Sequence, residues 1–237
     1  MRILVTRPLG ASRRTAQRLK ALGHDPVVLS VTEAEHHPDE VRDALGRPYS
    51  ALLVTSAEAV RVAQSLGTGL SEHLGATVFT VGDATAAAAR EAGFSDVEAA
   101  EGTGASMVKL FGERWSRLAS ARPLLYLAGW PRSPSLEAGL AELRIPLTVV
   151  RAYAMRPLEV APEAMTAALR HPPVDAVLFY SRETARRFFE LAPIADVPAH
   201  ARLLCLSGNV MEAIPEELRH NVRIAARPDE ESLLALL

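Results

Sequence analysis

Hydrophobic and polar positions along the chain follow two periods in turn. Short apolar runs such as residues 51–55 are typical of buried strands. The stretch before Gly23, in contrast, places Ala16 and Leu19 at helical spacing and ends at a residue that stops helices. The order strand, helix, strand continues to the end of the chain. Because parallel strands need a crossover connection, usually a helix, this alternation predicts an α/β fold with parallel sheets.

The same pattern sets the expected element boundaries. Strands are expected at residues 2–6, 27–32, 51–55, 77–81, 124–127, 147–155, 174–180, 202–206 and 222–225. Helices are expected in the stretch before Gly23 and at residues 39–45, 57–66, 84–92, 105–115, 135–143, 162–170, 182–191, 209–218 and 229–236.

Two strand-favourable stretches, near residues 27–34 and 147–156, bear on domain organisation. Both are long against the usual strand of about five or six residues. No Gly/Ser-rich linker marks an end-to-end boundary, so we expect each stretch to run from one lobe to the other. This predicts a first lobe of residues 1–33 and 156–237, a second lobe of residues 34–155, and hinge motion between them.

One chemical layout occurs twice in the chain, 125 residues apart. The apolar run of residues 51–55 ends at Ser56, and the matching run of residues 176–180 ends at Ser181. In each copy a second strand ends 26 residues after the serine, at Gly82 and at Ser207. Two matched lobes are the economical explanation of this duplication.

Each copy ends its strand in small polar residues that begin a helix, where free backbone N–H groups and the helix dipole favour anions. Two such lobes facing each other would enclose a cleft suited to carboxylates or phosphates. For any one turn taken alone, the simpler interpretation is that small residues permit a tight turn and cap the helix.

Composition and charge exclude some classes of protein. The 237 residues are 49% apolar, which is ample for real cores, and the net charge of −2 argues against a generic nucleic-acid or acidic-membrane binder. Lys20 and Lys109 are the only lysines, so the other 24 of the 26 basic residues are arginines. Arginine suits a polyanionic ligand, although a bias of the source genome explains the same excess more simply.

The sequence also bears on location. The N-terminal residues begin a strand without the pattern of a signal peptide, and no apolar run approaches the roughly 18 residues that span a bilayer. Cys205 is the single cysteine, so no disulfide forms within the chain, and its place in an apolar strand predicts a small buried side chain. We therefore expect a cytoplasmic protein.

Several familiar catalytic motifs are absent. Thr6–Gly10 stands after the first strand where a dinucleotide-binding fingerprint would need G-x-G-x-x-G, and no P-loop occurs. The seven histidines show no H-E-x-x-H spacing, so no metal site is expected. Neither Ser56 nor Ser181 lies in a G-x-S-x-G motif, which gives a serine hydrolase little support.

The remaining candidates are hydroxyl groups and backbone turns, namely Thr55, Ser56, Thr85, Tyr153, Ser181 and Ser207. Hydroxyls are weak acids and bases, so such a set suits a reaction that needs positioning more than strong proton transfer. Tyr153 is the best single donor because it lies on a stretch expected to connect the lobes. The alternative is an ordinary aromatic residue of a strand.

A series of short motifs resembles the uroporphyrinogen-III synthase family. The motifs are Val5-Thr6-Arg7-Pro8, Val54-Thr55-Ser56 with Ala59-Val60, Val81-Gly82-Asp83-Ala84-Thr85-Ala86, Leu127-Ala128-Gly129, Val150-Arg151-Ala152-Tyr153 and Phe179-Tyr180-Ser181. They cover nearly the whole chain in order. Each is short, so the resemblance depends on the series.

The resemblance implies two flavodoxin-like, HemD-type parallel-sheet lobes joined by a two-stranded linker. It also implies a lyase that closes linear hydroxymethylbilane into uroporphyrinogen III, with loss of water and inversion of the terminal pyrrole ring, in tetrapyrrole and heme biosynthesis. The resemblance further implies an enzyme that acts without cofactor or metal and, as is usual in the family, is a monomer. The implied partner is a polycarboxylate tetrapyrrole substrate, with a transient contact to the preceding enzyme of the pathway and no nucleic acid or membrane.

The resemblance implies two catalytic residues, Thr85 and Tyr153, the latter a tyrosine proposed to help the hydroxyl leave. Substrate carboxylates would be held, largely by backbone N–H groups, at Thr55, Ser56, Gly82, Asp83, Ala84, Gly129, Ser181, Ser207 and Gly208, with the basic Arg7 and Arg132 near those turns.

The chain departs from the family pattern at two turns. Ser207-Gly208-Asn209-Val210 stands where the family often has glycine and two threonines, which weakens the case for side chains that hold an anion there. Residues 130–134 replace the usual run toward an arginine and a glutamate, so Arg132 is a displaced candidate. The altered last turn keeps open a second hypothesis, a ligand-binding or sensory protein of the same fold that binds an acidic small molecule without reaction.

Overall fold

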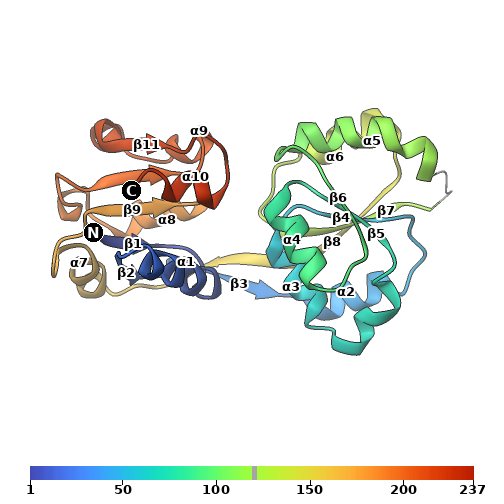
Figure 1. Ribbon diagram of the computed structural model, residues 1–237, viewed down its shortest axis with the longest axis horizontal. Helices are drawn as coiled ribbons and strands as arrows, with labels where there is room; N and C mark the ends of the chain where they lie inside the picture. The colour runs from blue at the N-terminus through green and yellow to red at the C-terminus, as the bar shows by residue number, and fades with distance from the viewer. Residues whose placement is uncertain (119–121) are drawn as a thin grey trace. The chain divides into compact units, whose positions relative to one another are not determined.

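The structure is a computed structural model that describes residues 1–118 and 122–237. Residue contacts divide it into two compact units, of which unit 1 is Met1–Glu33 with Arg156–Leu237 and unit 2 is Ala34–Met155 (Figure 1). Both boundaries fall inside strands, one in β3 (Thr32–His36) and one in β8 (Leu147–Pro157).

Unit 1 contains, in the part of the chain that the structure describes, a parallel sheet of five strands in the order β11-β10-β9-β1-β2. The strands are β1 (Arg2–Val5), β2 (Asp25–Val28), β9 (Ala176–Phe179), β10 (Arg202–Cys205) and β11 (Val222–Ile224). The helices are α1 (Leu9–Ala21), α7 (Pro162–Arg170), α8 (Arg182–Leu191), α9 (Gly208–Met211) and α10 (Glu230–Leu234), with short 3-10 turns η2 (Ile194–Asp196) and η3 (Glu216–Asn221).

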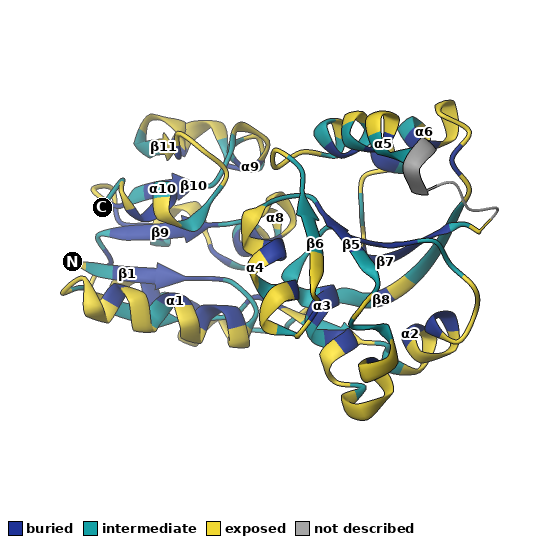
Figure 2. Ribbon diagram, turned by 45° about the vertical axis from the view of Figure 1, so that its right-hand side comes forward, coloured by how far each residue is buried: buried dark blue, intermediate teal, exposed yellow. Residues whose placement is uncertain are grey.

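The inner strands of unit 1, β9, β1 and β10, are buried on both faces because helices cover both. Leu4 and Val177 point to the core formed with α7 and α8, whereas Ile3 and Leu178 point to the core formed with α1 and α10. Figure 2 shows β1 and β9 as mostly buried, whereas α1 carries both buried and exposed residues. The continuous apolar runs of the sequence follow from this burial on both sides.

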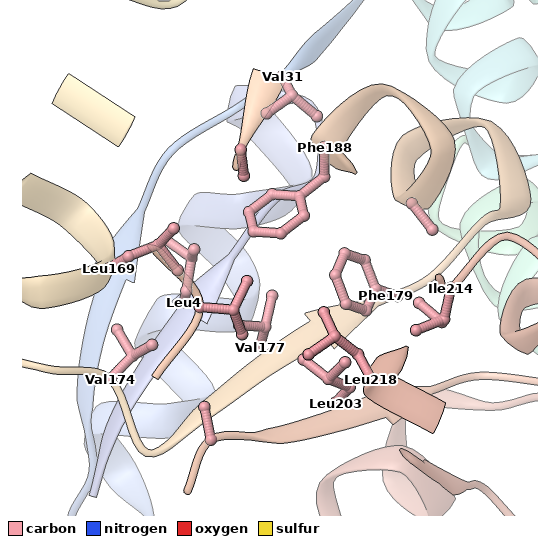
Figure 3. Packing of buried hydrophobic residues seen from close by; sticks show 14 of the residues in the cluster. Leu4, Val31, Leu169, Val174, Val177, Phe179, Phe188, Leu203, Ile214 and Leu218 are labelled. Carbon is pink, nitrogen blue, oxygen red and sulfur yellow. The ribbon is translucent and has the colours of Figure 1, made fainter. Parts of the chain in front are cut away.

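Aromatic packing fills the larger core of unit 1. The rings of Phe179 and Phe188 meet edge to face with centroids 5.3 Å apart, and Leu203 and Ile214 lie in the same cluster (Figure 3). Rings at this distance and angle contribute about 0.5–1.5 kcal/mol beyond the apolar area they bury. Helix α8 is thereby held against β9, the strand that leads to Ser181.

Unit 2 contains, within the described residues, a sheet in the order β3-β8-β7-β4-β5-β6, whose pairs from β8 to β6 are parallel. The further strands are β4 (Leu52–Val54), β5 (Thr77–Thr80), β6 (Asp96–Ala99) and β7 (Leu124–Trp130). The helices are α2 (Pro38–Leu45), α3 (Ala57–Gln64), α4 (Asp83–Glu91), α5 (Gly104–Leu118) and α6 (Ser135–Glu142), with a 3-10 turn η1 (Gly67–His73).

Alternate residues of β4, β5 and β7 in unit 2 also point to two different cores. Leu52 and Val54 of β4 pack with α2, α3 and α4, whereas Leu53 packs with α5 and α6. The prediction of a mixed α/β protein with parallel sheets is therefore confirmed. This alternation also decides to which side each residue after β4 turns.

The prediction of one strand from 27 through 32 was wrong. Strand β2 ends at Val28 and β3 begins only at Thr32. Val31 lies fully buried in the core of unit 1, and its carbonyl accepts a hydrogen bond from the backbone N–H of Leu158. The chain bends to bury this side chain, a tertiary demand that strand propensity does not reveal.

The C-terminal part of the chain differs from the prediction in one helix. The expected helix at 209–218 is only the four-residue α9, followed by a turn and η3. Pro215 explains this, because proline lacks an N–H and disfavours helical geometry in the residue before it.

One strand, β6, was not predicted from the sequence. It was missed because its sequence, Asp-Val-Glu-Ala, carries the charges that edge strands tolerate.

Candidate active site

The strand order of unit 2 brings three predicted turns together. Strand β4 lies between β7 and β5, so the turns that follow these parallel strands meet at one edge of the sheet. Thr55 and Ser56 follow β4, Gly82 follows β5, and Gly129 lies near the end of β7. In parallel sheets this carboxyl edge is where ligands bind.

The duplicated layout of the sequence has the same backbone shape in both units. Ser56 has φ −147° and ψ 139°, and its counterpart Ser181 has φ −145° and ψ 151°. The second pair agrees as well, with φ −168° and ψ 172° at Gly82 against φ −159° and ψ 169° at Ser207. Each of the four is the extended residue that immediately precedes a helix.

The two serines cap their helices. The Ser56 hydroxyl accepts a hydrogen bond from the backbone N–H of Glu58 at 3.1 Å, and Ser181 accepts one from Thr184 at 3.1 Å. Ser181 also donates to the Thr184 hydroxyl at 2.9 Å. The capping interpretation of these side chains is thus what the structure shows. Any anion bound at these turns would meet backbone N–H groups more than the serine hydroxyls.

Tyr153 lies directly over Gly129. A Cβ atom added at Gly129 would stand 2.4 Å from both the phenol oxygen and the Cζ atom of Tyr153. The pairing of β7 with β8 shifts register between Ala128 and Gly129, so that Gly129 faces Tyr153. The missing side chain lets the phenol cross β7 toward the end of β4, where it hydrogen-bonds with Ser56.

Burial raises the pKa of the Tyr153 phenol, while its hydrogen bond with Ser56 acts in the opposite direction. The net shift is upward, so the phenol stays neutral at physiological pH and retains a proton to donate. A neutral phenol at the carboxyl edge of the sheet is a suitable donor to a leaving oxygen.

Tyr126 joins this edge of the sheet and was not among the predicted site residues. Its phenol oxygen lies 3.0 Å from the Thr55 hydroxyl, and its side chain is 3% exposed. Burial raises the pKa of Tyr126, against smaller lowering effects from Thr55 and from the Arg132 guanidinium. The signal available in the sequence was weak, because Tyr126 is simply the one polar-tipped residue of the apolar run 124–128.

Arg132 follows β7 and is held on two sides. Its Nε donates to Glu137 at 2.5 Å, and its guanidinium carbon lies 4.6 Å from the centre of the Trp130 ring. Both contacts fix the side chain of Arg132, which the sequence placed away from the position of the family's usual arginine. Arg132 also lines a hollow of about 510 Å³ in unit 2, together with Arg47 and Arg151.

Thr85 belongs to the first turn of α4, and its side chain is buried, with 7% exposure. Its backbone N–H donates to the Gly82 carbonyl at 3.1 Å. Asp83 and Ala84, in contrast, are exposed at the same helix start. The structure therefore brings Gly82, Asp83 and Ala84 to the carboxyl edge as accessible groups and turns the Thr85 side chain inward.

In unit 1 the predicted residue Arg7 takes part in an internal network. Its guanidinium carbon lies 3.9 Å from the centre of the Tyr180 ring, and its Nη1 donates to Glu230 at 3.1 Å. Thr15, Arg18 and Tyr180 donate to the same carboxylate, at 2.6, 2.7 and 2.8 Å. Burial acts to raise the pKa of Glu230, but these donors outweigh it and the pKa is lowered.

The last predicted turn follows β10, next to the turn after β9 in the sheet of unit 1. Ser207 precedes α9 and makes no capping bond with its side chain, and Gly208 is exposed. The strand order brings this turn beside that of Ser181. Its contribution to binding remains a prediction.

The described residues form neither a metal-binding cluster nor a membrane-spanning helix. No group of three or more His, Cys, Asp or Glu side chains in residues 1–118 and 122–237 is arranged to hold a metal ion. Within the same ranges, every helix is too short or too polar to cross a membrane.

Comparison with known proteins decides the family. The sequence profile of uroporphyrinogen-III synthase HemD matches residues 13–235. The chain belongs to this family. The resemblance inferred from the short motifs is thereby confirmed, and the chain is a cyclising lyase of tetrapyrrole biosynthesis. A search of curated proteins by sequence gives no significant match.

Solved structures agree on the fold of the family. Uroporphyrinogen-III synthetase from Helicobacter pylori is 19% identical, with a TM-score of 0.65 over 100% of this chain and 98% of that one. A mutant uroporphyrinogen III synthase from Thermus thermophilus is 23% identical, with a TM-score of 0.58 over 99% of this chain and 96% of that one. At these identities the likeness concerns the fold alone.

Proposed function

We propose that the chain converts hydroxymethylbilane into uroporphyrinogen III with Tyr153 as the proton donor to the departing hydroxyl. The family match carries the reaction. The observation that carries the role of Tyr153 is its phenol, neutral and partly buried, lying over Gly129 at the carboxyl edge of the unit 2 sheet. No other side chain at this edge combines a raised pKa with partial exposure among the described residues.

The reaction needs little acid or base beyond that proton. A pyrrole nitrogen supplies the electron pair that expels the hydroxyl, and the proton from Tyr153 lets it leave as water. The resulting azafulvene is attacked by the substituted carbon of the terminal ring, and the spiro intermediate reopens and closes in the inverted sense. The proton that the terminal ring loses on regaining aromaticity balances the one donated by the phenol. The protein's main contribution is to hold the flexible chain in the geometry that leads to inversion.

The substrate carries many carboxylates, and the matched turns are suited to bind them. Support comes from the extended residue before each helix, which leaves the first backbone N–H groups of α3, α4 and α8 pointing out of the helix. We assign carboxylate binding to Arg7, Thr55, Ser56, Gly82, Asp83, Ala84, Gly129, Arg132, Ser181, Ser207 and Gly208. Thr85 would act by keeping the turn before α4 in shape, because its side chain is buried.

We also propose how the two units correspond to the lobes of the family fold. Units 1 and 2 would be the two HemD-type lobes, with residues 1–33 and 156–237 in one lobe, residues 34–155 in the other, and β3 and β8 as connectors. A monomeric state, a transient contact with the preceding enzyme and a cytoplasmic location remain predictions of the family resemblance.

Product analysis tests the function directly. The chain is mixed with freshly prepared hydroxymethylbilane, and the oxidised porphyrins are separated by chromatography. The type III isomer should dominate, because unassisted closure gives type I. A non-catalytic protein of the same fold would bind the pyrroles and leave only type I, which would reject the enzymatic proposal.

Replacing Tyr153 by phenylalanine should lower kcat by about a hundredfold, the lower end of what a positioned general acid contributes. KM should change far less, because the ring still fills its place over Gly129. Steady-state kinetics measures both constants. Tyr49→Phe is the matched control, since Tyr49 hydrogen-bonds with His73 at 2.8 Å and takes no part in the proposed site. An unchanged kcat in Tyr153→Phe would remove Tyr153 from this role.

A further inference from the structure

The turn after β4 has two consecutive hydroxyl residues that are contacted from opposite sides of the sheet. Ser56 hydrogen-bonds with Tyr153, which packs with the core of α2, α3 and α4. Thr55 hydrogen-bonds with Tyr126, which belongs to the core of α5 and α6. Two tyrosines, Tyr126 from β7 and Tyr153 from β8, therefore hold the same turn. Tyr153 is the proposed proton donor, whereas Tyr126 has no role in the proposed function.

The position of Tyr126 follows from strand register. Leu53 of β4 pairs with Tyr126 of β7, and residues two apart in a strand point to the same face. The side chain of Thr55, two residues after Leu53, thus lies on the same side as the phenol. Tyr126 is buried and Thr55 is partly exposed, so Tyr126 supports from within a residue that a substrate can reach.

Packing alone does not require a phenol at this position. A phenylalanine fills the same volume, whereas a tyrosine in an apolar core needs a partner for its hydroxyl. The partner is a residue of the proposed carboxylate-binding turn, and both Arg132 and Glu137 act electrostatically on the same phenol. The hydroxyl therefore lies in the polar edge of the site, with Thr55 as its hydrogen-bonding partner.

We propose that Tyr126 is a positioning residue for the reaction, one that fixes the Thr55 side chain and thereby the turn that binds a substrate carboxylate. The inference rests on the proposed function and on the binding role of Thr55. Tyr126 touches no substrate itself. Its removal should weaken substrate binding through Thr55 while the proton transfer by Tyr153 continues.

A double-mutant cycle with Tyr126→Phe and Thr55→Val tests this role. Each single variant should raise KM by about three- to tenfold, which corresponds to the loss of one neutral hydrogen bond. The kcat of each should change by less than about twofold. The double variant should be no worse than Thr55→Val, because Tyr126 acts only through Thr55. Thr55→Ser keeps the hydroxyl and should restore a KM close to that of the wild type.

Three further outcomes separate this inference from the proposed function. If Thr55→Val raises KM and Tyr126→Phe does not, Tyr126 is a core residue only and the proposed site stands. If neither variant changes KM while the wild type still makes the type III isomer, the binding role of Thr55 and this inference both fall. A coupling seen in the free energy of unfolding but absent from KM would also overturn the positioning role. Tyr49→Phe, which deletes another phenol of unit 2, serves as the control and should leave KM unchanged.

Discussion

Gly129 is the residue whose missing side chain most directly decides the geometry of the proposed site. Tyr153 crosses β7 at this position, and any Cβ there would stand well inside van der Waals contact with the phenol. The register shift between Ala128 and Gly129 brings the two residues opposite each other. A substitution at Gly129 would therefore displace the proposed proton donor, Tyr153, without changing its chemistry.

Gly129→Ala should lower kcat to a similar extent as Tyr153→Phe and destabilise the fold by about 1–3 kcal/mol, as overpacking of a filled site does. Steady-state kinetics and urea unfolding measure the two effects. Gly75→Ala is the control, because no heavy atom lies within 4 Å of the added Cβ at Gly75. Wild-type turnover in Gly129→Ala would show that the phenol is not needed in this position.

At the scale of elements, α10 depends on side-chain contacts. A helix of five residues has no stability of its own in water. Asp229 caps it by accepting a hydrogen bond from the Ser232 N–H at 2.7 Å, and Leu233 lies in the core of unit 1. Glu230 adds bonds to residues of α1 and to the residues just after β1 and β9. One carboxylate thus links the last helix to the N-terminal part of the chain and to the residue that follows β9.

Glu230→Gln should lower the free energy of unfolding at neutral pH by about 2 kcal/mol, the size of a lost charged hydrogen bond. The pKa of Glu230 is lowered in the folded state, so its contribution is present above the ordinary value of 4.5 and is lost as the pH falls through the folded value. The gap between variant and wild type should therefore shrink in acid, as measured by urea unfolding at several pH values. Glu231→Gln, at an exposed neighbour, should change little, and a gap independent of pH would contradict the ionic role.

At the scale of the whole molecule, burial acts in one direction on every tyrosine and on the cysteine. Tyr49, Tyr126, Tyr153 and Tyr180 are the four tyrosines of the chain, and burial raises the pKa of each. Burial also raises the pKa of the Cys205 thiol from 9.0 to about 12. The prediction that Cys205 is a small buried side chain is confirmed, since it lies fully inside the core of unit 1.

The folded chain should therefore lose stability as the pH rises above 9. A raised folded pKa stabilises the native state below the unfolded value, and the contribution is lost as the pH rises from the unfolded toward the folded value. For Cys205 this window runs from 9.0 to about 12, and the tyrosines follow from 10.0 upward. Denaturant unfolding from pH 7 to 11 measures the decline. Cys205→Ala should delay its onset by about one pH unit, whereas an unshifted onset would mean that the thiol is not responsible.

Much of the fold could be predicted from local pattern, because the signals lie within a few residues of each other. Apolar runs, helix stops and small residues after strands located β4, α3, β9 and α8 and the two serines that cap these helices. Elements whose form depends on distant contacts were missed. The bend that buries Val31 and the polar edge strand β6 are set by the packing of the surrounding unit.

The sequence by itself determined the parallel α/β class, the family and the candidate positions Tyr153, Ser56 and Ser181, since period, turn chemistry and motif order are local properties. Only the tertiary structure decided that Tyr153 lies over Gly129, that Tyr126 holds Thr55, and that Arg7 is bound by Glu230. These contacts join residues 24, 71 and 223 positions apart. Such pairs depend on strand order and register, which no local pattern specifies.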